Sequence, residues 1–207
     1  MDDSRKNDSR GIEASPENQK PKENPVLLYL HDLVYLLAGV VLVLLLLFRI
    51  VVVSGPSMFR TLMDGDYLII VSRAIYHTPR QGDIIVASKE SFRNGEPIVK
   101  RVIATEGQTV DIDFETGVVY VDGVALEEDY VYTPTNHYEG TAFPLTVDDG
   151  CVFVMGDNRN LSMDSRDPEI GQIDCRQILG KAVFLFFPGT NEGTLKRDFG
   201  RIGVLQG

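Results

Sequence analysis

The chain has 207 residues, a formal net charge of −10 and 43% hydrophobic residues. This length allows one globular domain in addition to an N-terminal segment. After residue 53 the sequence holds 14 basic and 23 acidic residues. A domain with this excess of acidic residues is not suited to coat nucleic acid or to bind anionic lipid by charge, so we expect no nucleic-acid partner.

The N-terminal part contains a polar tail followed by an apolar run. Residues 1–25 are rich in Asp, Asn, Ser, Lys, Glu and Pro, which is typical of a disordered tail. Residues 33–48 carry no charge, and residues 50–53 continue the run beyond Arg49. Sixteen helical residues cover about 24 Å, and apolar neighbours extend the run toward the roughly 30 Å of a bilayer core. The sequence therefore predicts a transmembrane anchor over residues 26–53.

Two alternatives exist for the apolar run, a buried core helix and a signal peptide. The run starts late for a signal peptide, and no small-x-small cleavage site follows it. The tail carries five basic but also six acidic residues, so the positive-inside rule only slightly favours a cytoplasmic N-terminus. We expect a single span with the following domain outside the cytoplasm.

From Tyr67 onward the sequence alternates short β-rich runs with turns. The Asp122-Gly123 pair is a signature of a two-residue hairpin. No 12-residue stretch after the span has good helical periodicity. The predicted fold is mainly β, with an antiparallel β-sheet domain over residues 54–207, a small β insertion at about residues 108–150, and one preceding transmembrane helix. The predicted strands cover residues 67–71, 84–87, 98–103, 118–121, 124–126, 151–155 and 182–187.

The two cysteines, Cys151 and Cys175, do not form a CxxC metal pattern, and we expect no metal site. In an extracytoplasmic domain they could pair as a disulfide. Alternatively, Cys151 is a small buried residue of its strand. Spacing does not decide between these two alternatives.

Ser57 follows a Gly-Pro turn directly after the apolar run, and it is a candidate nucleophile. A serine hydroxyl becomes an effective nucleophile only when a nearby base takes its proton. The three histidines, His31, His77 and His137, lie at the membrane edge or in turn-like polar contexts, which are typical of solvated histidines. The sequence also has no Gly-x-Ser-x-Gly elbow.

Lys100 is a candidate base because it lies inside an apolar strand, residues 98–103. Strand alternation places Lys100 on one face with Ile98 and Val102, and directs Arg101 to the other face. An ε-amine buried in apolar surroundings loses its charge and can accept a proton. The alternative is a strand lysine whose ammonium reaches solvent.

A polar loop, residues 156–166, follows the apolar strand at residues 151–155. Asp164 and Arg166 could form a structural ion pair in this loop. Ser162 could form a hydrogen bond with a lysine amine. The alternative is an ordinary turn with helix-capping residues.

Together these three elements resemble the type I signal peptidases of bacteria, and more closely the Gram-positive members. The resemblance covers about residues 33–190. It rests on Ser57-Met58 with Thr61-Leu62, on Lys100-Arg101, on the Gly-Asp-Asn-Arg and Ser-x-Asp-Ser-Arg parts of the loop, and on Gly65-Asp66-Tyr67 and Gly82-Asp83.

The resemblance implies that Ser57 is the nucleophile and Lys100 the general base. The backbone N–H of Ser57 would contribute to the oxyanion hole, and Gly55 offers no side-chain donor there. Ser162 would orient the lysine. The supporting residues are Ser162, Asp164, Arg166, Arg101, Gly156 and Asp157.

The implied function is that of a membrane-anchored serine endopeptidase that removes N-terminal signal peptides from exported preproteins after a small residue. Met58, Ile98 and Val99 would line the substrate pocket, and no cofactor is expected. The implied partners are preproteins, the lipid bilayer of the cell membrane and a nearby secretion translocon.

Three positions depart from the family pattern: Arg60 replaces a proline, Leu161 replaces an asparagine, and Gln108 lies where Pro-Gly-Asp is common. None of these changes removes a proton-transfer group. Two other functions match parts of the sequence. One is a Ser-Lys self-cleaving peptidase of related fold, and the other is a non-catalytic membrane-anchored β module.

Overall fold

The computed structural model describes residues 24–90, 92–190 and 196–206. The predicted disordered tail, residues 1–25, lies almost entirely outside the described residues. Helix α1 spans Pro25–Leu47, and it is long and apolar enough to cross a membrane by length and composition. Proline suits the first helical position because no N–H is needed there. The Asn24 side chain caps the helix by accepting a hydrogen bond from the Val26 N–H (3.1 Å).

The helix ends earlier than predicted, and this corrects the anchor boundary at residue 53. Strand β1 spans Phe48–Val52 and pairs antiparallel with β2, Tyr67–Ser72. The reason is the change from leucines to the β-branched residues Ile50, Val51 and Val52, which favour extended backbone. The end of the apolar run, residues 48–52, is therefore part of a sheet.

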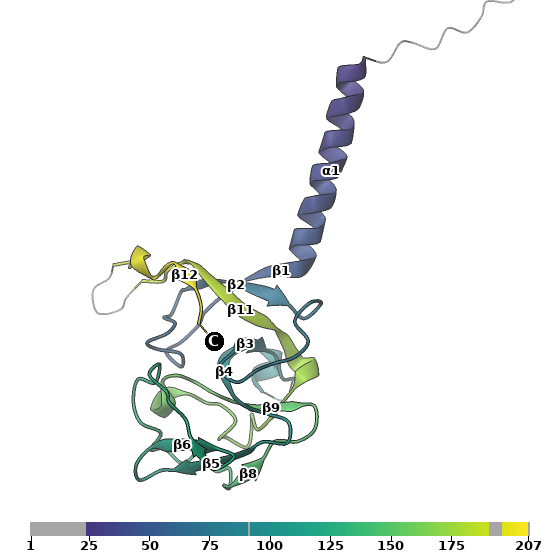
Figure 1. The fold of residues 1–207 in the computed structure, drawn as a ribbon. Coiled ribbons are helices and arrows are strands. Elements are labelled where there is room, and N and C mark those ends of the chain that lie inside the picture. Colours follow the sequence, from purple (N-terminus) through teal and green to yellow (C-terminus); the bar gives the residue numbers. More distant parts are fainter. Residues whose placement is uncertain (1–23, 91, 191–195, 207) are drawn as a thin grey trace, which may run out of the picture. The chain divides into compact units, whose positions relative to one another are not determined.

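In the described part of the chain all strand pairs are antiparallel, and they form two sheets (Figure 1). The larger sheet has the order β1-β2-β11-β3-β4-β9-β10, with β12 beside β11, and the smaller has the order β7-β6-β5-β8. The remaining strands are β3 (Ile84–Ala87), β4 (Ile98–Thr105), β5 (Thr109–Asp113), β6 (Val118–Val121), β7 (Val124–Ala125), β8 (Leu145–Thr146), β9 (Cys151–Met155), β10 (Ile173–Asp174), β11 (Ile178–Phe187) and β12 (Gly203–Val204). Short 3₁₀ helices cover Arg93–Gly95, Arg159–Leu161, Cys175–Gln177 and Phe199–Arg201.

The predicted fold class is confirmed: the structure is mainly antiparallel β and is preceded by one apolar helix. The smaller sheet, β5 to β8, falls within the range predicted for the insertion. Figure 1 shows β5, β6 and β8 beyond β4 and β9, away from β2 and β11. Two buried apolar clusters lie on opposite faces of β3, one with Ile84 and Val86 and the other with Ile85 and Ala87. A third cluster joins β4 and β9 to the smaller sheet.

Strand β4 is the element that positions the site. It pairs with β3 on one side and with β9 on the other, where Arg101 faces Met155. The loop that begins at Gly156 therefore starts beside Lys100. This register brings two of the three predicted elements together.

Candidate active site

The turn that carries Ser57 is held by backbone and side-chain hydrogen bonds. Gly55 has a φ of +85°, a conformation that glycine adopts without strain, and its N–H donates to Asp64 Oδ1 (2.7 Å). The Ser57 carbonyl accepts a hydrogen bond from the Asn158 N–H (2.9 Å). The Asn158 side chain donates to the Pro56 carbonyl (3.1 Å). The turn is therefore fixed against the loop that follows β9.

The residues after Ser57 fasten the turn to the core. Met58 and Leu62 are fully buried in the same apolar cluster. The structure thus corrects the assignment of Met58 to the substrate pocket, because its side chain packs in the core and does not line the pocket. Arg60, at the usual proline position, is exposed, and none of the hydrogen bonds that hold the turn involves its side chain.

Lys100 and Ser57 lie in direct contact. The Lys100 Nζ is 2.8 Å from the Ser57 Oγ, and Lys100 is only 5% exposed. Forty-three residues separate the two along the chain, so the contact depends on the packing of β4 beneath the Ser57 turn. A buried amine within hydrogen-bond distance of a serine hydroxyl has the geometry of a nucleophile and its base.

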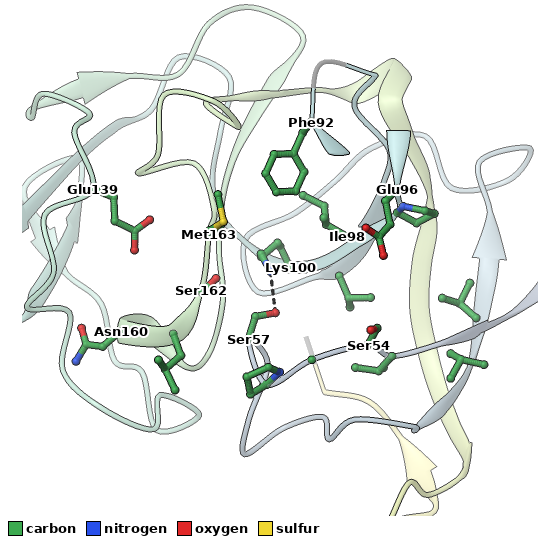
Figure 2. Close-up of a pocket in the computed structure, with 18 residues that line it drawn as sticks. Ser54, Ser57, Phe92, Glu96, Ile98, Lys100, Glu139, Asn160, Ser162 and Met163 are labelled. Atoms are coloured by element: carbon green, nitrogen blue, oxygen red, sulfur yellow. Dashed lines mark hydrogen bonds between the residues drawn. The ribbon is translucent and has the colours of Figure 1, made fainter. Parts of the chain in front are cut away.

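A cavity of about 610 Å³ opens above this pair (Figure 2). Residues 51–57 and 96–100 line one side, including the predicted Ile98 and Val99. Residues 160–163 line the other side together with Glu139, and Phe92 completes the lining. The volume is within the usual range for ligand pockets. All three predicted elements therefore contribute to one pocket.

Arg101 points away from Lys100 and forms a buried ion pair. Its Nε and Nη2 donate to the two carboxylate oxygens of Asp157 at 2.9 and 2.8 Å. Its guanidinium also lies 3.9 Å from the ring centre of Tyr130. Burial lowers the pKa of Arg101, but the hydrogen bonds and charge of Asp157 outweigh this effect and raise the pKa. Arg101 therefore braces the start of the polar loop as a permanent cation.

Asp164 and Arg166 form a second buried ion pair within the loop. Arg166 Nε and Nη2 donate to the Asp164 carboxylate, both at 2.8 Å, and both side chains are fully buried. The Gly156 N–H donates to Asp164 Oδ2 (2.9 Å). Burial lowers the pKa of Arg166, whereas Asp164 raises it above its usual value. Asp164 thus links the start of the loop at Gly156 to its end at Arg166.

Gly156 lies where three parts of the site approach each other most closely. A Cβ atom at this position would be 2.3 Å from the Ser162 Oγ and 2.4 Å from the Ser57 carbonyl oxygen. Neither distance is compatible with a side chain. Glycine is therefore required by close packing between the Ser57 turn and Ser162.

Ser162 lines the pocket and is 4% exposed. Within the part of the chain that the structure describes, its Oγ has no hydrogen-bond partner. The predicted contact with the Lys100 amine is therefore not formed here, although both groups lie in the same pocket.

Sequence reasoning missed several residues that complete the site. Glu128 and Tyr130 come from the insertion: Glu128 forms an ion pair with the buried Arg159, and Tyr130 contacts Arg101. Glu139, also from the insertion, lines the pocket. These residues lie in an irregular segment between β7 and β8, where no motif or periodicity marks them.

The histidines and cysteines lie outside the pocket. His31, His77 and His137 are not among the residues that line it. Cys151 and Cys175 are free thiols that pack against different apolar clusters. In the described ranges, no group of three or more His, Cys, Asp or Glu residues is arranged to hold a metal ion.

Comparison with known proteins gives consistent matches. The family described as "Signal peptidase, peptidase S26" matches residues 27–187. A probable signal peptidase I-1 of Synechocystis sp. is 39% identical over 168 residues, which covers 75% of this chain and 82% of the relative. A signal peptidase I of Bacillus licheniformis is 32% identical and covers 83% of this chain and 94% of the relative. A crystal structure of a signal peptidase I from Enterococcus faecalis, 33% identical, covers 50% of this chain and 96% of that chain with a TM-score of 0.41.

Proposed function

Because the chain belongs to the signal peptidase family, peptidase S26, we propose that it removes signal peptides from preproteins with Ser57 as nucleophile and Lys100 as general base. The family resemblance seen in the sequence is confirmed, and the enzyme class is that of a signal peptidase. The roles of individual residues are the proposal.

The main support for these roles is the 2.8 Å contact between Lys100 Nζ and Ser57 Oγ at the base of the cavity. The mechanism requires Lys100 as the neutral amine, and withdrawal of a lysine from water favours that form. Arg101 and Arg166 each have a carboxylate partner of their own, Asp157 and Asp164. These pairs hold the site without placing an arginine against the reacting atoms.

The proposed reaction is acyl transfer in two halves. In the first half, Lys100 takes the Ser57 proton while Oγ attacks the scissile carbonyl, and the oxyanion that forms is held by the Ser57 N–H. Lys100 then protonates the leaving amine, and the C–N bond breaks. In the second half, Lys100 takes a proton from water and the hydroxide attacks the ester carbonyl. The bond between the acyl carbon and Ser57 Oγ then breaks, which releases the signal peptide with a free carboxyl group, and Lys100 returns the proton to Oγ.

The pocket walls support cleavage after a small residue. Residues 51–54 and 97–99 lie on the side of the pocket next to the dyad. An extended signal peptide can bind there as an added strand, with main-chain hydrogen bonds for affinity. Ile98 and Val99 then leave room only for small side chains before the scissile bond.

The proposal includes membrane anchoring through α1, with the N-terminus in the cytoplasm and residues 54–207 outside it. The helix has the length and composition for a span. Anchoring would keep Ser57 near signal peptides that leave a secretion translocon. The orientation is tested by adding a protease-sensitive tag to the N-terminus: protease outside intact cells should leave this tag uncut.

The test of catalysis uses the full chain in detergent with a purified preprotein. The wild type should release a mature protein whose new N-terminus follows a small residue, as read by mass spectrometry. Ser57→Ala and Lys100→Ala should release none, whereas Lys181→Ala, which removes a lysine paired with Asp83, should remain active. Normal cleavage by either dyad variant would refute the assignment.

A further inference from the structure

Glu139 belongs to none of the motifs that define the site, yet the structure holds it in the catalytic pocket. Its Oε1 lies 3.2 Å from Arg166 Nη2. The same loop is attached to Arg166 by two more contacts: Thr141 N–H donates to the Arg166 carbonyl (3.0 Å), and Arg166 Nη1 donates to the His137 carbonyl (3.4 Å). The position of Glu139 is therefore fixed by the catalytic loop.

Only one oxygen of the Glu139 carboxyl group has a partner. Its side chain is 19% exposed, and its Oε2 is buried without a hydrogen-bond partner within the described residues. The Ser162 Oγ, in the same pocket, is also buried and without a partner. Buried polar atoms are normally satisfied, so two such atoms in one cavity indicate a place for a bound group with hydrogen-bond donors.

The charges around Glu139 also favour a bound group that is a cation. Arg166 is shared between two carboxylates, with a bidentate contact to Asp164 and one contact to Glu139, so these three side chains carry a net negative charge when Glu139 is ionised. Burial and the charges of Asp164 and Asp167 raise the pKa of Glu139 to about 7, while Arg166 and Lys100 oppose this shift.

Apart from the shared Arg166, no permanent cation faces Glu139 among the described side chains that line the pocket. Of the described side chains that line it, the charged ones are Glu96, Lys100 and Glu139. Figure 2 shows the two glutamates on opposite sides, with Lys100 and Ser57 between them. In the proposed mechanism Lys100 acts as the neutral amine, which leaves two carboxyl groups in the cavity.

We propose that Glu139 is a specificity-determining residue that binds a lysine or arginine side chain of the substrate next to the scissile bond. The ammonium or guanidinium group donates to Oε2 and, within reach, to the Ser162 Oγ. This inference rests on the proposed signal peptidase function, because it assigns a second contact to the same bound peptide.

The test compares peptides that span a cleavage site already shown to be cut. Peptides with lysine are compared with peptides that carry norleucine, its uncharged analogue of similar shape, at the second residue before the bond and at the first and second residues after it. The positions that face Ile98 and Val99 keep small side chains. At one position the wild type should favour lysine about tenfold in kcat/KM. Glu139→Gln, which keeps an oxygen for Arg166, should reduce this ratio to within about twofold of unity.

The matched control is Glu96→Gln, the same change on the opposite side of the pocket, and it should keep the preference. The inference is overturned if no position favours lysine, if Glu139→Gln keeps the full ratio, or if Glu96→Gln loses it instead. A purely structural role for Glu139 would lower kcat/KM for both peptides alike and leave their ratio unchanged.

The pH dependence of the ratio gives a second readout. Glu139 is mainly protonated below pH 7 and ionised above it, so the lysine preference should increase through about pH 7 in the wild type and be flat in Glu139→Gln. The ratio cancels the ionisation of the general base, which acts on both peptides. Cleavage by Ser57→Ala would refute the proposed function. If Ser57→Ala is inactive but Glu139→Gln keeps the full lysine-to-norleucine ratio, only the role of Glu139 is refuted.

Discussion

Lys100 and Arg101 are neighbours on β4, but they lie in two different regions of the site. Lys100 enters the pocket and contacts a hydroxyl, the Ser57 Oγ. Arg101 lies on the opposite face, where the Asp157 carboxylate, the Gly82 carbonyl (2.8 Å) and the Tyr130 ring surround its guanidinium. One side chain has a reactive partner, and the other has partners that keep it charged and immobile.

The difference shows how one strand can supply both chemistry and support. A carboxylate partner stabilises a cation, whereas a hydroxyl partner is compatible with a neutral amine. Because both residues belong to β4, its pairing with β3 and β9 fixes the position of Lys100, the proposed base, and of Arg101, the brace, at the same time. Changes at Lys100 and at Asp157 should therefore have separable effects, the first on catalysis and the second on stability.

The largest effect is expected when the proposed base, Lys100, is replaced by a permanent cation. Lys100→Arg should lower kcat/KM for preprotein cleavage by at least about 10³-fold, because a guanidinium does not deprotonate and cannot accept the Ser57 proton. The matched control is Lys181→Arg, where the cation pairs with Asp83, and its activity should remain near that of the wild type. Substantial cleavage by Lys100→Arg would show that Lys100 is not the base.

The next effect concerns the brace. Asp157→Asn should lower the free energy of unfolding by about 3 kcal/mol, because Arg101 is left as a buried charge without its carboxylate. Asp174→Asn removes the carboxylate of the surface Arg176 pair and should change stability little. Chemical denaturation of all three proteins measures the difference. Equal stabilities for the two variants would mean that the buried pair is not a brace.

A third prediction tests the contact between the two regions. Gly156→Ala should lower kcat/KM about 100-fold, because the new Cβ would displace Ser162 or the Ser57 turn from its position over Lys100. The control is Gly203→Ala in β12, where a Cβ would have no atom within 4 Å. If both alanine variants cleave equally well, the tight packing at Gly156 has no role in positioning the dyad.

Most of the fold could be predicted because the signal is local. Apolar runs marked β4 and β9 to within two residues, and the Asp122-Gly123 turn marked the β6–β7 hairpin. Strand β1 was missed for a physical reason: residues suited to a bilayer and residues suited to a buried strand are equally apolar, so the run gave no boundary at Leu47.

The site was predictable only in part. Ser57 and Lys100 lie in recognisable motifs, and the structure brings them together. Glu128, Tyr130 and Glu139 were not predictable, because each acts through a contact across the fold: Glu128, for example, pairs with a residue 31 positions away. Met58 shows the opposite error, since a residue next to the nucleophile was assigned to the pocket but packs in the core.

The smallest expected effect concerns the connection between the Ser57 segment and the brace. Thr61 is half-buried, and its hydroxyl donates to Asp157 Oδ2, the oxygen that also accepts from Arg101 Nη2. Thr61→Val keeps the shape but removes this donor, and it should lower the free energy of unfolding by about 1.5 kcal/mol, the usual range for a hydrogen bond to a charged group. Thr109→Val removes an exposed hydroxyl pair with Thr146 and should cost less. In the Asp157→Asn background the Thr61→Val change should also cost less, because the charged acceptor is gone. Additive losses would mean that the Ser57 segment and the Arg101 brace are energetically independent, although a single carboxylate touches both.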